Sequence, residues 1–485
     1  MVTDFCQEDT PMTRDEVRAS ARRLVQWHER FAGYFGRTEA QRHALLYLKG
    51  LMSDLKRKSV EPIALQFART AAGGPATQNE VVALQGFLTN SPWEAGDVFA
   101  EIQSVFAEEL VPSTRQWSIG TVGVIDESAY VKAGKESVGV ASQWCGRLGK
   151  TANCQVGVHL IGVTPAGVSA LDGQLFLTKK WIADRPRREK TGVPREVRFQ
   201  SKPQIAAEMI RRTVAAGKVG FDWIIADALY GDSGEFLDSL EAAGHRYVLE
   251  VRKNTLVWTV DPATLPGSMP GPKVRKKLGS YRYKEVRSVQ EVAAELPAEA
   301  WRPLKLREGA KGPLVFEFAV LRVWAMRHNR SGPPIWMVIR RSFEATPDVK
   351  YYVSNAGVET RWEAMAMVTG ARIRVEEYLE DGKMHLGMAD YEARGWSSWH
   401  HHMALVALAH LYVTLTKRDM KRDVPELTLD MALRLLRSAF ARRKLGTEQA
   451  INIVNYHLKR NHVAHDSHRK SWLQKHKQLK KKLLL

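Results

Sequence analysis

Two carboxylates follow buried-looking apolar segments of this sequence. Asp126 comes directly after the apolar residues 121–125, and Asp227 comes directly after residues 221–226. Continuous apolar runs of this length are typical of strands buried on both faces of a sheet. An acid at the end of such a strand is costly to bury unless a positive charge meets it. The alternative for a lone Asp in this position is a side chain that caps a turn.

A third carboxylate lies on an expected helix near the end of the chain. A capping box of Thr360 and Glu363 predicts the start of a helix that runs to about residue 383. Arg372, Glu376 and Lys383 are separated by steps of four and seven residues, so they share one helical face. Such a row suggests a carboxylate held between two cations. The alternative is an exposed i,i+4 Arg–Glu pair.

Together, Asp126, Asp227 and Glu376 are candidate catalytic residues and candidate metal ligands. Hard carboxylate oxygens suit Mg2+ or Mn2+, which also accept phosphate oxygens and water. Two such ions about 3.5–4 Å apart can activate a nucleophile and stabilise the leaving oxygen in phosphodiester cleavage or transfer. Glu377 is the fallback for the third acid, but the spacing to Arg372 and Lys383 favours Glu376.

The charge balance predicts a polyanionic partner. The 485 residues include 72 Lys and Arg against 53 Asp and Glu, a net charge of +19. A surplus of this size points to nucleic acid. The sequence has no uncharged apolar run long enough to span a bilayer, and its three cysteines have no CxxC spacing. We therefore expect a cytoplasmic protein associated with the nucleoid, with double-stranded DNA as partner and no membrane.

Periodicity indicates how the acids are positioned. Residues 12 to about 110 read as helices with basic faces, which predicts either a DNA-binding helical domain or a merely solvated one. From residue 118 the pattern changes to strands, with a hairpin over 154–163 and 167–177, a polar loop over 179–198 and a helix over 201–216. This order predicts a mixed sheet with a helical crossover. An apolar helix over 396–416 is expected in the core.

Five motifs in this order resemble bacterial DDE transposases of the insertion sequence 701 family. They are Val124-Ile125-Asp126; Gly134-Lys135-x-Ser137-Val138-Gly139-Val140-x-x-Gln143; Trp181 with Arg187-Arg188 and Gly192-Val193-Pro194; Ala226-Asp227-x-x-Tyr230-Gly231; and Glu376 with Lys383, Leu386-Gly387, Tyr391-Glu392-x-Arg394 and Trp399-x-x-His402-Met403. The resemblance covers roughly residues 15 to 415.

The resemblance implies an α/β fold with a ribonuclease-H-like mixed-sheet catalytic core and a β-rich insertion before the glutamate. It implies Asp126, Asp227 and Glu376 as the catalytic acids, with Arg372 and Lys383 around Glu376 as contacts for DNA phosphates. We expect a helical, DNA-binding domain over 1–115, the core over 116–251 and 357–425, the insertion over 252–356, and a basic helical C-terminal region over 426–485.

The predicted function is therefore a DNA transposase. Such an enzyme binds the terminal inverted repeats of an insertion sequence as a homodimer, then cleaves and transfers DNA strands with two Mg2+ ions, or Mn2+ in their place. One alternative is a DNA-binding protein derived from a transposase that has lost catalysis. Another is a stand-alone metal-dependent nuclease. The three intact acids favour the active transposase.

Overall fold

The computed structural model describes residues 14–439 except 72, 265–284, 310–311, 329, 345 and 421–426, together with positions 463, 467, 470 and 474. Most of the predicted C-terminal region and part of the predicted insertion therefore lie outside the described residues. Across the described residues, no helix combines the length and the apolar character needed to cross a membrane.

Helices dominate the N-terminal part of the chain, as the sequence predicted. The capping box of Thr77 and Glu80 forms at the start of one of them, where the Thr77 N–H donates to Glu80 Oε2 at 2.7 Å. Their apolar faces bury Tyr47, Leu84 and Phe106 against one another and against the rest of the core. The helices are α1 (Arg14–Ala32), α2 (Thr38–Met52), α3 (Val60–Phe67), α4 (Gln78–Thr89) and α5 (Ala95–Glu109).

Within the described residues, twelve strands form one mixed sheet. Hydrogen-bonded neighbours follow the order β2-β3-β1-β5-β6-β12-β11-β10-β7-β8, with β4 beside β3 and β9 beside β10. The pairs β1–β5 and β5–β6 are parallel, and the other pairs are antiparallel. The strands are β1 (Val122–Val131), β2 (Ala141–Cys145), β3 (Lys150–Thr164), β4 (Gly167–Leu175), β5 (Trp223–Ala226), β6 (Tyr247–Val251), β7 (Leu256–Trp258), β8 (Val286–Ser288), β9 (Arg302–Gly309), β10 (Gly312–Arg327), β11 (Arg330–Arg341) and β12 (Val349–Ser354).

Short helices connect the strands, and 3-10 turns occur between them. The predicted polar loop over 179–198 contains two helices, because Thr178 and Asp184 each accept a backbone N–H and cap a first turn. The crossover from β4 to β5 contains α8, whose capping box joins Ser201 and Gln204. The helices are α6 (Lys179–Ala183), α7 (Arg185–Lys190), α8 (Lys202–Ala215), α9 (Ala228–Gly231), α10 (Gly234–Ala242) and α11 (Val289–Ala294), and the 3-10 turns are η1 (Gly33–Phe35), η2 (Val111–Gln116), η3 (Gly146–Leu148), η4 (Pro262–Thr264) and η6 (Ala298–Ala300).

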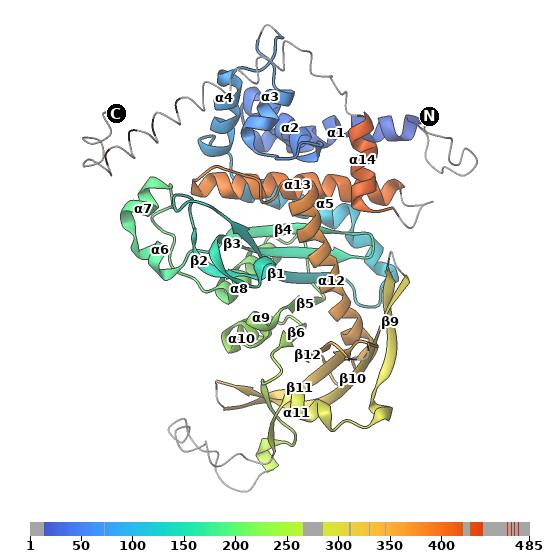
Figure 1. Ribbon diagram of the computed structural model, residues 1–485. Coiled ribbons are helices and arrows are strands. Elements are labelled where there is room, and N and C mark those ends of the chain that lie inside the picture. The colour runs from blue at the N-terminus through green and yellow to red at the C-terminus, as the bar shows by residue number, and fades with distance from the viewer. Residues whose placement is uncertain are drawn as a thin grey trace.

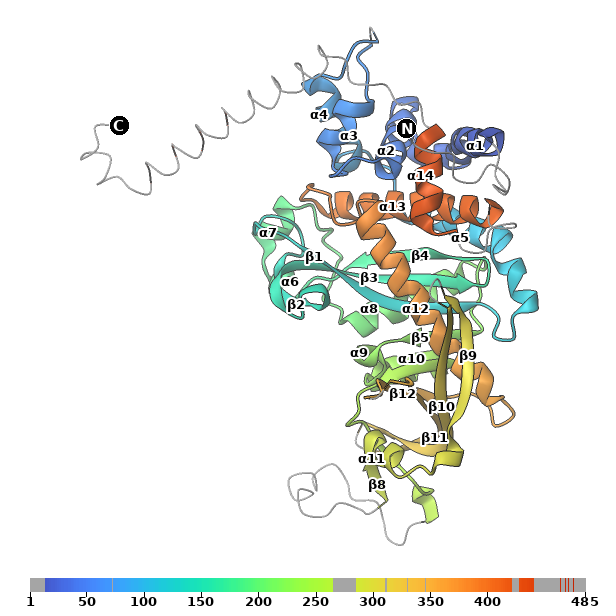
Figure 2. The ribbon, with the colours of Figure 1, turned by 45° about the vertical axis from the view of Figure 1, so that its right-hand side comes forward.

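In the part of the chain that the structure describes, three helices follow the sheet: α12 (Trp362–His385), α13 (Trp396–Met420) and α14 (Leu429–Ala439). The apolar α13 runs between the N-terminal helices and strands β1–β4 (Figures 1 and 2) and is buried over most of its length, as predicted. Trp399 of α13 packs directly over Gly157 of β3, where a Cβ atom would lie 2.7 Å from the Trp399 ring. Glycine at this position therefore permits the close approach of α13 to the sheet.

The long helix α12 crosses the sheet and contacts β1, β3, β5 and β6 (Figure 1). It begins at Trp362 with Arg361 as its N-cap, and no side chain caps its first turn. The predicted capping box of Thr360 and Glu363 is therefore wrong. Glu363 instead pairs with Arg361 at 3.2 Å.

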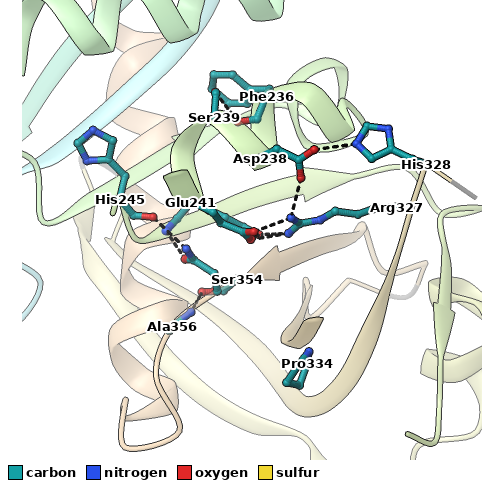
Figure 3. A network of polar contacts seen from close by, with 12 residues as sticks. Phe236, Asp238, Ser239, Glu241, His245, Arg327, His328, Pro334, Ser354 and Ala356 are labelled. Carbon is teal, nitrogen blue, oxygen red and sulfur yellow. Dashed lines mark hydrogen bonds and ion pairs between the residues drawn. The ribbon is translucent and has the colours of Figure 1, made fainter. Parts of the chain in front are cut away.

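An ion-pair network joins the β10–β11 hairpin to α10 (Figure 3). Arg327 donates to both carboxylate oxygens of Glu241 at 2.5 and 2.6 Å and to Asp238 at 3.1 Å. The Arg327 side chain is only 9% exposed and also donates to the Tyr247 hydroxyl of β6 at 2.7 Å. His328, in a left-handed conformation with φ of 47°, contacts Asp238 at 2.7 Å. The hairpin is thereby held against the parallel part of the sheet.

We predict that Arg327→Met lowers the free energy of unfolding by about 2 kcal/mol, because it leaves Glu241 half-buried without its cation. The melting temperature should fall by about 2 °C, as followed by circular dichroism, because the unfolding entropy of a chain of this length is about 1 kcal/mol/K. Arg330→Met, at an exposed position of the same hairpin, is the matched control. Equal melting of the two variants would contradict this account of the network.

Candidate active site

Three acidic residues occupy equivalent register positions along the three parallel strands. Ile125 of β1 lies opposite Ala226 of β5, and Ala226 lies opposite Leu249 of β6. The next residue along each of these chain segments is Asp126, Asp227 or Glu250. Equivalent positions on neighbouring strands point to the same face of a sheet. The register therefore brings three carboxylates together on one face.

Backbone contacts fix the two aspartates. Asp126 is 9% exposed, and its Oδ1 accepts the backbone N–H of Glu127 at 2.7 Å. Asp227 is the N-cap of α9, and its Oδ1 accepts the backbone N–H of Leu229 at 2.9 Å. Each carboxylate keeps a second oxygen for which the structure gives no hydrogen bond. The turn-capping role considered for a lone Asp is therefore real for Asp227, but it uses only one oxygen.

Helix α12 carries a guanidinium to this row of acids. Arg372 Nη1 donates to Glu250 Oε2 at 2.5 Å, and Arg372 Nη2 lies 3.9 Å from Asp126 Oδ2. Burial by itself would lower the pKa of Arg372, but the nearby carboxylates of Asp126, Glu250, Asp227 and Glu376 outweigh burial and raise it. Arg372 is therefore a permanent positive charge among the acids.

The charges on the three predicted acids are coupled. Burial raises the pKa of Asp126 to about 6, Arg372 opposes this rise, and Asp227 and Glu376 add to it. The effect of Asp227 is larger than that of Glu376, which is exposed at the surface of α12. Burial of the Asp126 carboxyl is thus the main cause of its raised pKa, and Arg372 offsets this rise only in part.

The neighbouring Glu377 points elsewhere. It forms an ion pair with Arg307 of β9, and it lines a cavity of about 420 Å³ together with Arg374, Tyr378 and Asp381. Glu376 is among the groups that raise the pKa of Asp126. The choice of Glu376 over Glu377 as the third acid stays a prediction.

Lys383 lies about two turns along α12 from Glu376. Its charge helps to lower the pKa of His159 to about 3, although burial of His159 is the larger cause. His159 of β3 lies opposite Asp126 in the β1–β3 register. The charge of Lys383 therefore acts on a residue that lies opposite Asp126 in the sheet. That Lys383 shares a helical face with Arg372 and Glu376 stays a prediction.

A second ion pair borders the site. Lys202 Nζ lies 2.5 Å from Glu127 Oε2, and the Tyr230 hydroxyl donates to Glu127 Oε1 at 3.1 Å. Burial, followed by the charges of Glu127, Asp227 and Asp126, holds the pKa of Tyr230 well above its usual value. Tyr230 thus remains a protonated donor beside the cluster.

Sequence reasoning missed Glu250, Glu127 and Lys202. A signal for Glu250 was present, since it follows the apolar residues 247–249 just as Asp126 and Asp227 follow apolar runs. Val251 follows it and continues the strand, which hid the resemblance. Nothing in the sequence indicates that Lys202 reaches Glu127, because 75 residues separate the two.

Several of the motif residues stabilise the loops around the end of β1. Trp181 Nε1 donates to the Val140 carbonyl at 2.8 Å, and the Arg187 guanidinium lies 3.9 Å from the Trp181 ring centroid. The Tyr391 hydroxyl donates to Gln155 Oε1 at 2.6 Å. These residues shape the surroundings of the acids and do not contact them.

The chemistry of the donor set fits a hard divalent cation. Asp126 and Asp227 offer carboxylate oxygens, and the pKa of Asp126 is raised mainly because its carboxyl is buried. In the described part of the chain, no three His, Cys, Asp or Glu side chains converge closely enough to hold an ion as they stand. Asp126 and Asp227 are the residues whose oxygens could contribute to holding such an ion.

A sequence profile described as DDE superfamily endonuclease matches residues 30–313, more than half of the chain. The chain belongs to this superfamily. The matched region includes Asp126, Asp227 and Glu250 and ends before α12. Endonucleases of the DDE superfamily generally use divalent metal ions.

The chain is also similar to a probable transposase for insertion sequence element IS701 from Microchaete diplosiphon. The two are 29% identical over 209 residues, which cover 43% of this chain and 48% of the relative. The chain thus matches about half the length of this curated relative.

We predict that Asp126→Asn stabilises the protein at pH 8 in EDTA. The folded-state pKa of Asp126, about 6, exceeds its ordinary value, so ionising the carboxyl costs the folded state more than the unfolded state. This cost develops as the pH rises through about 4 to 6 and persists above it. The substitution removes it, a gain of about 2–3 kcal/mol at pH 8.

The gain should shrink as the pH is lowered to 5, as measured by thermal unfolding of both proteins at each pH. A variant that melts below the native protein at pH 8 would contradict the raised pKa of Asp126.

Proposed function

We propose that this chain is a DNA transposase that cleaves and transfers DNA strands with divalent metal ions. The carrying observation is the electrostatic coupling of Asp126, Asp227 and Glu376 around Arg372 in a member of the DDE superfamily. The similarity to a probable transposase supports the wider activity. The substrate would be the terminal inverted repeats of an insertion sequence, moved by cut-and-paste transposition.

The proposed catalytic core is ribonuclease-H-like and is interrupted by the β-rich residues 252–356. Support comes from the parallel strands β1, β5 and β6, which present the acids, and from the antiparallel strands that extend the same sheet. The ligands proposed for two Mg2+ ions, or Mn2+, are Asp126, Asp227 and Glu376. Bound there, the ions would polarise the phosphodiester and favour an ionised nucleophile.

The protein's own groups have distinct roles in this proposal. The aspartates remain ionised at neutral pH once cations are close, because opposite charge lowers a carboxyl pKa. Arg372 adds fixed positive charge where the phosphoryl oxygens become more negative in the transition state. Lys383, on the same face of α12, contacts a DNA phosphate and orients it.

Double-stranded DNA is the proposed partner, both at the element ends and at the target. The net charge of +19 supports this, since phosphate neutralisation by Lys and Arg supplies much of the affinity for DNA. The helical residues 1–115 are the proposed DNA-binding domain. Pairing two element ends calls for two active sites, so we propose a homodimer on DNA, associated with the nucleoid in the cytoplasm.

A derived DNA-binding protein without catalysis is the second candidate, and a metal-dependent nuclease the third. A protein that no longer catalyses a reaction gains nothing from burying Asp126 beside Asp227, because this burial destabilises the fold at neutral pH. Retention of the charged cluster therefore favours the active enzyme.

We expect Asp126→Asn, Asp227→Asn and Glu376→Gln each to reduce DNA cleavage by about a thousandfold or more, because each removes an oxygen ligand needed in the transition state. Binding of the element ends should change little. Gel-based cleavage of end DNA with Mg2+, beside a mobility-shift assay, measures the two effects.

Glu377→Gln is the matched control, since it changes the adjacent glutamate, which pairs with Arg307. Its cleavage should stay within about twofold of the native rate, as expected for an exposed ion pair. Loss of cleavage in Glu377→Gln with retention in Glu376→Gln would move the third acid by one residue.

Lys383→Ala should slow single-turnover cleavage of pre-bound ends by about 10–100-fold, because a phosphate clamp tightens as charge builds on the phosphoryl oxygens. Its affinity for the ends should fall only modestly, and Lys383→Arg should recover part of the rate. Unchanged cleavage by the alanine variant would make this lysine a surface charge without a role in the chemistry.

A further inference from the structure

Glu250 is a fourth carboxylate at the row of acids, and it has its own cations. It lies one strand beyond Asp227 in the parallel register. Its Oε2 accepts a hydrogen bond from Arg372 at 2.5 Å and lies 3.6 Å from Lys350 Nζ of β12. Its side chain is 19% exposed, and that of Arg372 is 15% exposed. Glu250 is thus a half-buried acid that pairs with two cations.

The two contacts of Arg372 are unequal. The guanidinium makes a short hydrogen bond with Glu250, while its nearest approach to Asp126, at 3.9 Å, is too long for one. Its Nε has no hydrogen-bond partner among the described residues. Glu250 therefore determines where the guanidinium lies, and Asp126 only attracts it.

This arrangement matters when a divalent cation enters. A guanidinium in direct contact with Asp126 would compete with the cation for the same oxygens and would repel it. A guanidinium held by Glu250 stays close enough to compensate part of the negative charge of the acids. It nevertheless leaves the Asp126 oxygens accessible. The opposing charge of Glu250 also reduces the repulsion between Arg372 and an incoming ion.

We propose that Glu250 is a positioning residue that holds the Arg372 guanidinium away from Asp126 and so keeps the Asp126–Asp227 carboxylates open to a divalent cation. The inference rests on the proposed function, because it assumes that these aspartates bind a cation. An ion pair that merely joins α12 to β6 would have the same contacts, but it would respond differently to substitution.

The test compares Mn2+ binding by the DNA-free, full-length protein and its variants, measured by isothermal titration calorimetry. In Glu250→Gln the guanidinium loses its charged partner and moves onto Asp126, so the Mn2+ affinity should fall about 10–100-fold. Glu250→Asp keeps the charge on a shorter side chain and should recover part of this loss. Glu250→Gln/Arg372→Gln lacks the competing cation and should bind Mn2+ within about threefold of the native protein or more tightly.

Recovery in the double variant is what an ordinary structural pair cannot give, since removing both partners would not restore a distorted site. Glu317→Gln is the matched control, because it breaks the Arg341–Glu317 pair at 2.7 Å between β10 and β11, where Glu317 is 23% exposed. Its Mn2+ affinity should equal that of the native protein. Thermal unfolding in EDTA checks that each variant is folded.

Native Mn2+ affinity in Glu250→Gln, or a double variant as weak as the single one, would overturn the role of Glu250 and leave the proposed function standing. A native protein that binds no Mn2+ would overturn the proposed function itself.

Discussion

Like-charged carboxylates crowded at one edge of a parallel sheet are the constraint on which the rest of this structure depends. Asp126, Asp227 and Glu250 lie level on β1, β5 and β6 because the parallel register leaves no other arrangement. Their mutual repulsion and the burial of Asp126 are compensated in part by Arg372 and, at Glu250, by Lys350. The position of α12, which carries Arg372, is therefore an electrostatic requirement as well as a packing result.

The scaffold around α12 satisfies this requirement. Helix α13 lies against the same sheet, and the absence of a side chain at Gly157 allows Trp399 to pack directly on β3. On the other side, β12 pairs with β6 and brings Lys350 to Glu250. The Arg327 network holds the β10–β11 hairpin to α10 and β6. Residues far apart in the chain thus stabilise the structure around Asp126.

Much of the sheet was predictable from sequence, because buried strands have continuous apolar runs. Strands β1, β3, β4 and β5 and the buried helix α13 all correspond to such patterns. Asp227 directly follows β5 as expected, but β1 continues to Val131, so the expectation that Asp126 ends its strand is wrong. The face shared by Arg372, Glu376 and Lys383 followed from helical spacing. These features depend on local periodicity, which a single sequence contains.

The remaining features depend on pairings between distant segments. Strand register and crossover geometry determine the pairing of β12 with β6 and place Glu250 beside Asp227. They also determine the contact of Lys202 with Glu127. The Thr360 capping box failed because α12 begins beyond it, with Arg361 as N-cap. Helical spacing alone favoured Glu376 over Glu377 as the third acid. Only the ion pair with Arg307 shows where the Glu377 side chain points.

We propose that β1, β5 and α12 together form one divalent-cation site. The most direct measurement of this site is anomalous diffraction from crystals of the protein with end DNA and Mn2+. We expect an anomalous peak within coordination distance of both Asp126 and Asp227, with Glu376 as a further ligand. A peak coordinated by Glu377 in place of Glu376, or no peak at the aspartates under conditions that support cleavage, would contradict it.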